Sequence, residues 1–305
     1  MAAPEEDSNH EVVSVVPRRL AAEVTEDQLR DLSGQAWCRA TQQVASDWQQ
    51  TGARAEAWEV LLFRRNVGLG RPHELAGLIA STGEQVAMAL AASVEAEAWS
   101  AYRKGVSLDE STAQGRASNA GNEMGHRAMA ELATYYLMGT GHALANITGR
   151  ALALDRSLHP SLLDGLGTWM PVGSPELKDW LSLNSDTVRR LRRVARTKPH
   201  LADVLGPLTT LLQNSAWHDL ERQRGSHYHR RRPQSFGVAG VPLANPWVED
   251  SPGSWRLSVG LRNYTDSQNL AHETTALARR VLTLLTTVMP ALHERLDTLI
   301  SEMSK

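Results

Sequence analysis

The chain has 305 residues, of which 42% are hydrophobic and 22% charged, with a formal net charge of −2. This composition is that of a globular protein and excludes an intrinsically disordered chain. Cys38 is the one cysteine, which excludes an intrachain disulfide and fits a reducing compartment. Many Ala and Leu residues, with nine Trp against two Phe, favour helix over sheet.

The first residues of the chain are acidic and short of apolar side chains, unlike a secretory signal. We find no uninterrupted apolar run of the roughly 18–20 residues that span a bilayer. The expectation is therefore a disordered tail over residues 1–24 and a cytoplasmic protein with no membrane partner.

The first helix is predicted to begin at Thr25, because Thr25 and Gln28 have the spacing of a capping box. From residue 29 to residue 48, apolar side chains then recur every three or four positions, as on a buried helical face. Further helices are expected around 58–63 and over 72–102, the latter with a proline in its first turn.

The longest predicted helix covers residues 119–154, where Gly139 and Gly141 indicate a kink or a close helix contact. A short helix is expected at 186–196, with apolar positions alternating with five arginines. Residues 201–228 are expected to be largely helical, with Pro233 excluding helix beyond residue 232.

The segment 233–263 is rich in Gly and Pro. Within it, apolar and polar residues alternate from Trp255 to Leu261, which predicts a strand, with 236–241 as its candidate hairpin partner. Apolar residues at a 4-3-4 spacing from Leu270 to Val288 predict a closing helix, with a kink before the following proline.

These elements predict a mainly α protein, a helical bundle with a small β-hairpin insert and an N-terminal helical extension. The polar stretch 105–118 is the expected boundary between two helical halves. We therefore divide the chain into the tail, an N-terminal helical region at 25–110 and a helical bundle at 111–305, with the irregular insert at about 233–263.

Charge is distributed unevenly along the chain. Between Asp186 and Arg232 there are eleven basic and four acidic residues, so this window carries +7 and the remainder −9. A basic patch on an acidic body indicates an anionic partner.

The densest chemistry lies in that window, where seven of the eleven residues from Arg222 to Arg232 are Arg or His. Arginine grips phosphate oxygens through two parallel hydrogen bonds, and histidine transfers protons near neutral pH. One Arg and one His near the same helix end can therefore support transesterification at an RNA phosphate. The candidates are Arg222 with His227 or His229, and Arg224 with His229.

An Arg followed by a polar residue and, after four to six positions, by a His near the end of a late helix resembles the HEPN superfamily. Arg222-Gln223 with His227 or His229 has this form, and the resemblance covers about residues 115–305. It implies a HEPN-like helical bundle that forms a homodimer, with two motifs facing one composite site. It also implies a metal-independent endoribonuclease of defence or toxin systems, with no cofactor, in which the His acts as acid and base and Arg222 steadies the phosphate. RNA would be the partner, and no recognition of DNA sequence is expected.

Three other interpretations of the same residues stay open. Arginines near a helix C-terminus complement its dipole without any ligand. The three histidines His218, His227 and His229 could instead ligate a metal. A non-catalytic helical module could also bind nucleic acid, a nucleotide or a protein partner through the basic patch.

A polar stripe on the longest helix is a second candidate. His142, Asn146 and Arg150 lie at i, i+4 and i+8, and a stripe that faces the bundle interior would be part of a site. If the two helices pack antiparallel, Asn146 or Arg150 could lie beside His227. The expected substrate-binding residues are therefore Arg224, Arg230, Asn146 and Arg150.

Overall fold

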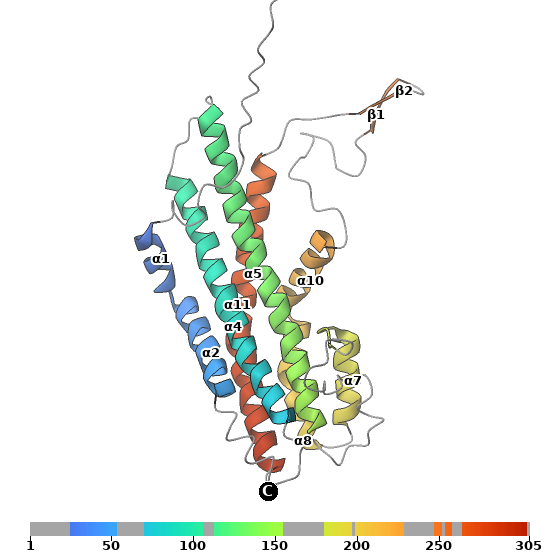
Figure 1. Ribbon diagram of the computed structural model, residues 1–305. Coiled ribbons are helices and arrows are strands. Elements are labelled where there is room, and N and C mark those ends of the chain that lie inside the picture. Colours follow the sequence, from blue (N-terminus) through green and yellow to red (C-terminus); the bar gives the residue numbers. More distant parts are fainter. Residues whose placement is uncertain are drawn as a thin grey trace, which may run out of the picture.

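The computed structural model describes residues 25–53, 70–105, 113–154, 180–196, 199–228, 247–251, 254–257 and 264–303. Four long helices form an elongated bundle (Figure 1): α2 (Ala36–Ala53), α4 (Gly70–Gly105), α5 (Ala113–Ala153) and α11 (Tyr264–Met303). Helix α4 packs between α2 and α5, and α11 contacts all three. The mainly helical fold class is confirmed, and its HEPN-like detail stays a prediction.

Shorter elements flank the bundle. The helix α1 (Glu26–Ser33) precedes α2 and contacts α4. Along α5 and α11 lie α7 (Ser185–Ala195), α8 (Pro199–Ala202), the 3₁₀ helix η1 (Asp203–Leu205), α9 (Gly206–Gln213) and α10 (Ser215–Tyr228). The strands β1 (Trp247–Ser251) and β2 (Ser254–Leu257) pair with each other in antiparallel orientation.

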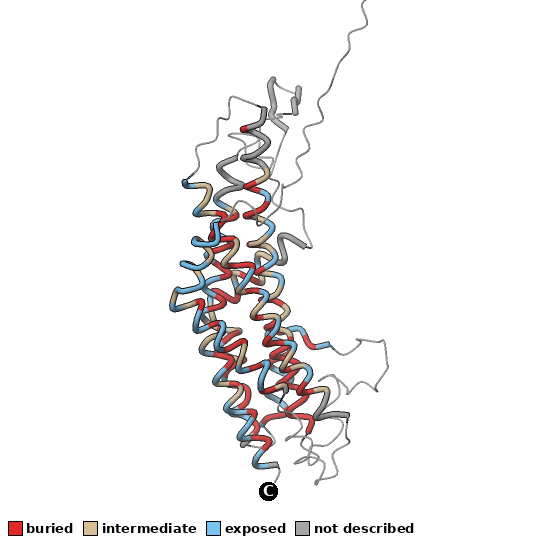
Figure 2. Tube along the Cα trace, turned by 60° about the vertical axis from the view of Figure 1, so that its left-hand side comes forward, coloured by how far each residue is buried: buried red, intermediate tan, exposed pale blue. Residues whose placement is uncertain are grey.

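The larger of two hydrophobic clusters among the described residues runs through the four long helices, and a smaller one, around Trp99, packs against α1. Figure 2 shows the buried residues of the larger cluster as inward-facing stripes along each long helix. The larger cluster joins both sides of the boundary expected at 105–118, because α4 packs directly against α5. Representative members are Trp48, Leu75, Leu144, Val188, Leu208, Trp217 and Val281.

Gly141 allows the closest of these packing contacts. A Cβ atom at this position would lie 2.0 Å from Cη2 of Trp217, so α10 can approach α5 only because residue 141 lacks a side chain. Neither Gly139 nor Gly141 interrupts α5, which is continuous from Ala113 to Ala153. The glycine pair therefore marks a close helix contact, at Gly141, and not a break in the helix.

The N-terminal helix begins as predicted but is not continuous. Thr25 and Gln28 form both hydrogen bonds of the capping box, each at 3.2 Å. The helix is then interrupted by a turn at Gly34 and Gln35, and α2 begins at Ala36. This interruption shifts the helical phase, so Ala36 and Ala40 are exposed, which corrects the single periodic face expected over residues 29–48.

The later helices follow the prediction with local breaks. Pro72 lies in the first turn of α4, and Val188, Leu191 and Ala195 are among the buried positions of α7, with Thr187 and Val194. Residues 201–228 are divided at Gly206 and Asn214 into separate helices. Helix α11 continues through Pro290, so the helix does not end at this proline.

Several predicted elements lie outside the described residues: the tail 1–24, the helix around 58–63, and residues 236–241 and 258–261 of the insert. The strand partner that the structure gives β2 is β1.

By length and composition, one described helix, Glu74–Gly105 within α4, could cross a membrane. Its alanines make it apolar on average without an uninterrupted apolar run. Of its most apolar window, 44% is buried, as expected for a central helix of a bundle. The cytoplasmic location stays a prediction.

Candidate functional site

Helix α10 carries the start of the predicted motif and is anchored at its first turns. The Asn214 side chain accepts a hydrogen bond from the backbone N–H of Ala216 at 2.9 Å, next to the start of the helix. Trp217 and Leu220 are buried against α5 and α11. The helix then runs away from this anchor toward the motif residues (Figure 1).

Arg222 is the motif residue whose side chain the structure describes. It is 80% exposed and lies 3.3 Å from the Asp219 carboxylate, which also accepts a 3.1 Å hydrogen bond from Arg280 of α11. Asp219 therefore links the candidate phosphate-binding arginine to α11. Such exposed pairs contribute roughly 0–1 kcal/mol to stability, so they leave Arg222 available to a ligand.

The remaining motif residues are placed less completely. Positions 224 and 227 lie within α10, but their side chains are not described, and His229 and Arg230 lie outside the described residues. Gln223 is directed toward α11, where its Nε2 donates to the Thr274 hydroxyl at 2.5 Å. Position 227 is four residues beyond Gln223 and shares its face, whereas Arg222 lies on a different face of α10.

His218 was the third histidine of the metal interpretation. Its Nδ1 lies 3.6 Å from the Glu221 carboxylate on the same helix. Among the residues that the structure describes, no group of three His, Cys, Asp or Glu side chains is arranged to hold a metal ion.

The polar stripe on α5, which is His142, Asn146 and Arg150, faces inward and forms hydrogen bonds with residues 181–183. The Asn146 side chain pairs with both backbone groups of Leu181, accepting from N–H at 3.0 Å and donating to C=O at 2.7 Å. His142 Nδ1 accepts a 2.9 Å hydrogen bond from the backbone N–H of Leu183. The arrangement holds residues 181–183 against α5 before α7 begins.

Arg150 completes this stripe. Its Nε donates to Glu74 of α4 at 2.6 Å, its Nη1 donates to Asn146 at 3.0 Å, and its guanidinium lies 5.7 Å from the Trp180 ring centroid. With four hydrogen bonds, the Asn146 amide has no donor or acceptor left for a substrate.

The structure does not bring this stripe to the motif. Helix α10 is antiparallel to α5, as assumed, since Trp217 lies at Gly141 and Gln223 bonds to α11 beside Thr275, the partner of His126. The C-terminal end of α10 thus lies toward the start of α5, away from Asn146 and Arg150. Their expected position beside His227 is corrected accordingly.

Sequence reasoning missed a buried polar cluster near that end of α10. Glu123 and His126 of α5 are 1% and 0% exposed, and His126 Nε2 lies 3.0 Å from the Thr275 hydroxyl of α11. The ring of His272 packs edge-on against His126, with centroids 5.0 Å apart. Within the part of the chain that the structure describes, neither Glu123 oxygen has a hydrogen-bond partner, and neither does His126 Nδ1. The i, i+3 spacing of Glu123 and His126 was the available signal.

The surroundings keep both imidazoles neutral. Burial, then the charges of His272 and Arg103, lowers the His126 pKa to about 4. Burial, then the charges of Lys104 and Arg103, also lowers the His272 pKa. Arg103 contributes to both shifts and Lys104 to that of His272, and both basic residues lie in the last turn of α4.

His272 also lines a groove of about 940 Å³ between α4, α11 and the start of α10. Its charged lining residues are Lys104, Arg279, Arg280 and Glu97. Arg279 lies 3.6 Å from Glu97 and stacks on Trp37, with 5.1 Å to the ring centroid. The groove combines an apolar floor with a cationic rim.

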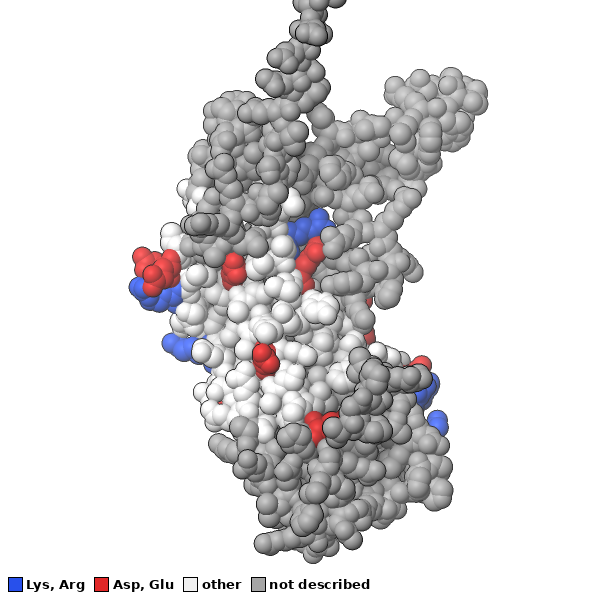
Figure 3. Space-filling model, viewed as in Figure 1, with Lys and Arg blue, Asp and Glu red and all other residues white. Residues whose placement is uncertain are grey.

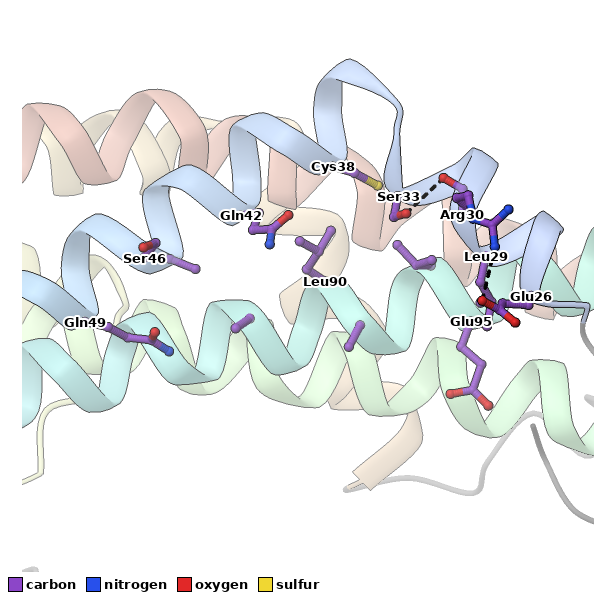
Figure 4. A pocket seen from close by; sticks show the side chains of 14 residues that line it. Glu26, Leu29, Arg30, Ser33, Cys38, Gln42, Ser46, Gln49, Leu90 and Glu95 are labelled. Atoms are coloured by element: carbon purple, nitrogen blue, oxygen red, sulfur yellow. Dashed lines mark hydrogen bonds and ion pairs between the residues drawn. The ribbon is translucent and has the colours of Figure 1, made fainter. Parts of the chain in front are cut away.

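A second groove, of about 840 Å³, lies between α1, α2 and α4 (Figure 4). Gln42, Ser46 and Gln49 form its polar wall, and Leu90 lies opposite them. Cys38 lies at this groove, where burial, then the charge of Glu97, raises its pKa to about 11. This thiol is therefore protonated at neutral pH and is not a nucleophile.

On the face shown in Figure 3, the described acidic and basic side chains are scattered over a largely uncharged surface. Among the described residues, basic side chains gather at the groove between α4 and α11 and on α7 with its C-cap, where five arginines from Arg189 to Arg196 are exposed.

No family model, curated protein or solved structure matches this chain.

Proposed function

We propose that the chain is a metal-independent endoribonuclease of HEPN type that cleaves RNA by transesterification. Arg222 binds the scissile phosphate, and His227 or His229 transfers the protons. Arg224 and Arg230 add positive charge beside the same phosphate.

The observation that carries this proposal is the exposure of the Arg222 side chain on an anchored helix. This side chain is 80% exposed, lies on a helix anchored by buried Trp217, and has the half-buried Asp219 carboxylate as its ion-pair partner. A guanidinium held this way can exchange a weak surface contact for a two-point contact with phosphate oxygens. The histidine positions follow within two turns along the chain.

The chemistry needs one nucleophile and one leaving group, both supplied by RNA. A neutral imidazole accepts the proton of the ribose 2′-hydroxyl as the 2′-oxygen attacks phosphorus, and the bond to the 5′-oxygen breaks. The leaving oxygen takes up a proton from an imidazolium. The products are a 2′,3′-cyclic phosphate and a 5′-hydroxyl, with Arg222 balancing the charge that develops on the phosphate.

A homodimer would supply a second copy of each group. Because position 227 and Arg222 occupy different faces of α10, a composite site with Arg222 from one protomer and a histidine from its partner satisfies the geometry more readily than one helix alone.

The test is cleavage of a single-stranded RNA in the presence of EDTA, with end-group analysis of the products. We expect the His227→Ala/His229→Ala variant to lose about 10²–10⁴-fold in rate, the usual contribution of proton transfer. Arg222→Ala should also lose most activity. His218→Ala is the matched control, since it removes an exposed histidine of the same helix. Undiminished cleavage by the double histidine variant contradicts the proposal, as does cleavage that EDTA abolishes.

The alternative is a non-catalytic module that binds nucleic acid through the same patch. The separation of Arg222 and position 227 on different faces of α10 favours it if the protein is monomeric. It predicts salt-sensitive RNA binding with no cleavage products.

A further inference from the structure

We infer that the groove between α4, α10 and α11 binds the phosphate backbone of single-stranded RNA. The choice of RNA rests on the proposed function, whereas the groove itself is independent of catalysis. None of its cationic residues belongs to the motif Arg222–Arg232.

Its shape and rim suit an extended polyanion. The groove measures about 940 Å³, and three of its four charged lining residues are basic. Lys104 lies in the last turn of α4, on one side of the groove, and Arg279 and Arg280 of α11 lie on the other. Arg279 and Arg280 are 47% and 54% exposed, so each can contact a ligand without first being uncovered.

The acids near this rim offset its charge only in part, because Arg279 lies 3.6 Å from Glu97 and Arg280 donates a 3.1 Å hydrogen bond to Asp219, whereas Lys104 also lines the groove. Glu97 is the acidic lining residue and is 17% exposed, beneath Arg279. Burial, the larger effect, raises the Glu97 pKa, while Arg279 lowers it. Burial is the larger cause of the lowered His272 pKa, and the charges of Lys104 and Arg103 add to it, so these two cations act at the groove that His272 lines.

The groove leads directly to the proposed catalytic arginine. Arg280 on the rim and Arg222 on α10 both contact the Asp219 carboxylate, at 3.1 and 3.3 Å. A strand whose phosphates follow Lys104 and Arg280 would therefore reach Arg222 without crossing an intervening helix. This continuity favours a chain of phosphates as the occupant, over an isolated phosphate ion.

The test measures binding separately from cleavage. A fluorescent 2′-O-methyl RNA lacks the nucleophilic hydroxyl, so it can bind but cannot react. Its affinity is measured as a function of salt for the wild type and for Lys104→Ala/Arg280→Ala. Loss of two phosphate contacts should weaken binding roughly tenfold near 0.1 M salt and reduce the log–log salt slope by about 1.4.

Two control variants isolate the groove. Arg190→Ala/Arg193→Ala removes the same charge from exposed positions of α7, which does not line the groove, and should bind normally. Lys104→Arg/Arg280→Lys keeps the charge and should retain binding, which excludes misfolding as the cause of loss.

An independent readout comes from His272. Phosphates that neutralise Lys104 should raise the His272 pKa, which is measured by NMR titration with and without the 2′-O-methyl RNA and assigned with His272→Gln.

Equal affinities of the two alanine pairs, a larger loss in the α7 pair, or an unmoved His272 pKa would overturn the inference. If Lys104→Ala/Arg280→Ala binds and cleaves RNA as the wild type does, the groove inference is wrong and the proposed catalysis stands. If the wild type binds RNA through the groove but does not cleave it, the proposed catalysis is wrong and the groove inference stands.

Discussion

His126 of α5 donates a hydrogen bond from Nε2 to the hydroxyl of Thr275 on α11, 3.0 Å away. The direction follows from the threonine, whose single hydroxyl hydrogen is donated to the Ala271 carbonyl at 2.8 Å. Nε2 therefore carries the ring proton, and Nδ1 is a bare lone pair with no partner among the described residues. This contact joins the two longest helices of the bundle through a neutral imidazole.

The neutrality of His126 predicts a loss of stability in mild acid. Its pKa is about 4 in the folded protein against an ordinary value of 6.5, so the unfolded chain takes up a proton at a higher pH than the folded chain does. Between these values the free energy of unfolding should fall as the pH falls, by up to about 1.4 kcal/mol per unit. Urea unfolding between pH 4 and pH 7 measures this slope.

His126→Gln is the control, because glutamine can keep the hydrogen bond to Thr275 but does not titrate. The variant should lose most of the slope, with a remainder from His272, whose pKa is also lowered. An unchanged slope in His126→Gln would assign the acid sensitivity to other groups.

Replacing Glu123 by an apolar residue should stabilise the protein. The Glu123 side chain is buried and both of its oxygens are unpaired among the residues that the structure describes, so no described contact offsets its desolvation. We expect Glu123→Met to raise the free energy of unfolding by about 1–4 kcal/mol. Exposed Glu84→Met on α4 should stay within about 0.5 kcal/mol of the wild type. A loss of stability in Glu123→Met would instead show that the carboxylate has a bound partner in solution.

Local signals in the sequence were sufficient for the helices. The Thr25 capping box and the spacing of Val188 and Leu191 depend on neighbours within one or two turns, and both are observed. The interruption at Gly34 was missed because apolar residues on either side of it keep an approximately helical spacing.

The candidate site could be predicted less well, because it depends on contacts between helices. The spacing of Asn146 and Arg150 on one face was correct, but spacing does not say that Leu181 and Glu74 occupy that face. The partner of His126 lies 149 residues away, which no local pattern contains.

Asn146 should be indispensable for holding the segment before α7. Asn146→Ala leaves the buried N–H and C=O of Leu181 without partners, which should cost about 2–5 kcal/mol for the two groups. Thermal and urea unfolding measure the loss. Gln43→Ala, which removes an exposed hydrogen bond to Asp47, should change stability by less than about 0.5 kcal/mol. If Asn146→Ala were equally mild, the segment 181–183 would not depend on this side chain.

Gly141 and Gly77 should respond oppositely to alanine. Both lie inside long helices and gain up to about 1 kcal/mol of helix propensity on substitution. A Cβ at Gly77 meets nothing within 4 Å, so Gly77→Ala should stabilise the protein. At Gly141 the Cβ would lie 2.0 Å from the Trp217 ring, and the overpacking should cost about 1–3 kcal/mol. In a Trp217→Leu background this cost should shrink, as measured by a double-mutant cycle of urea unfolding. An equal cost with leucine at position 217 would show that α10 does not pack on Gly141.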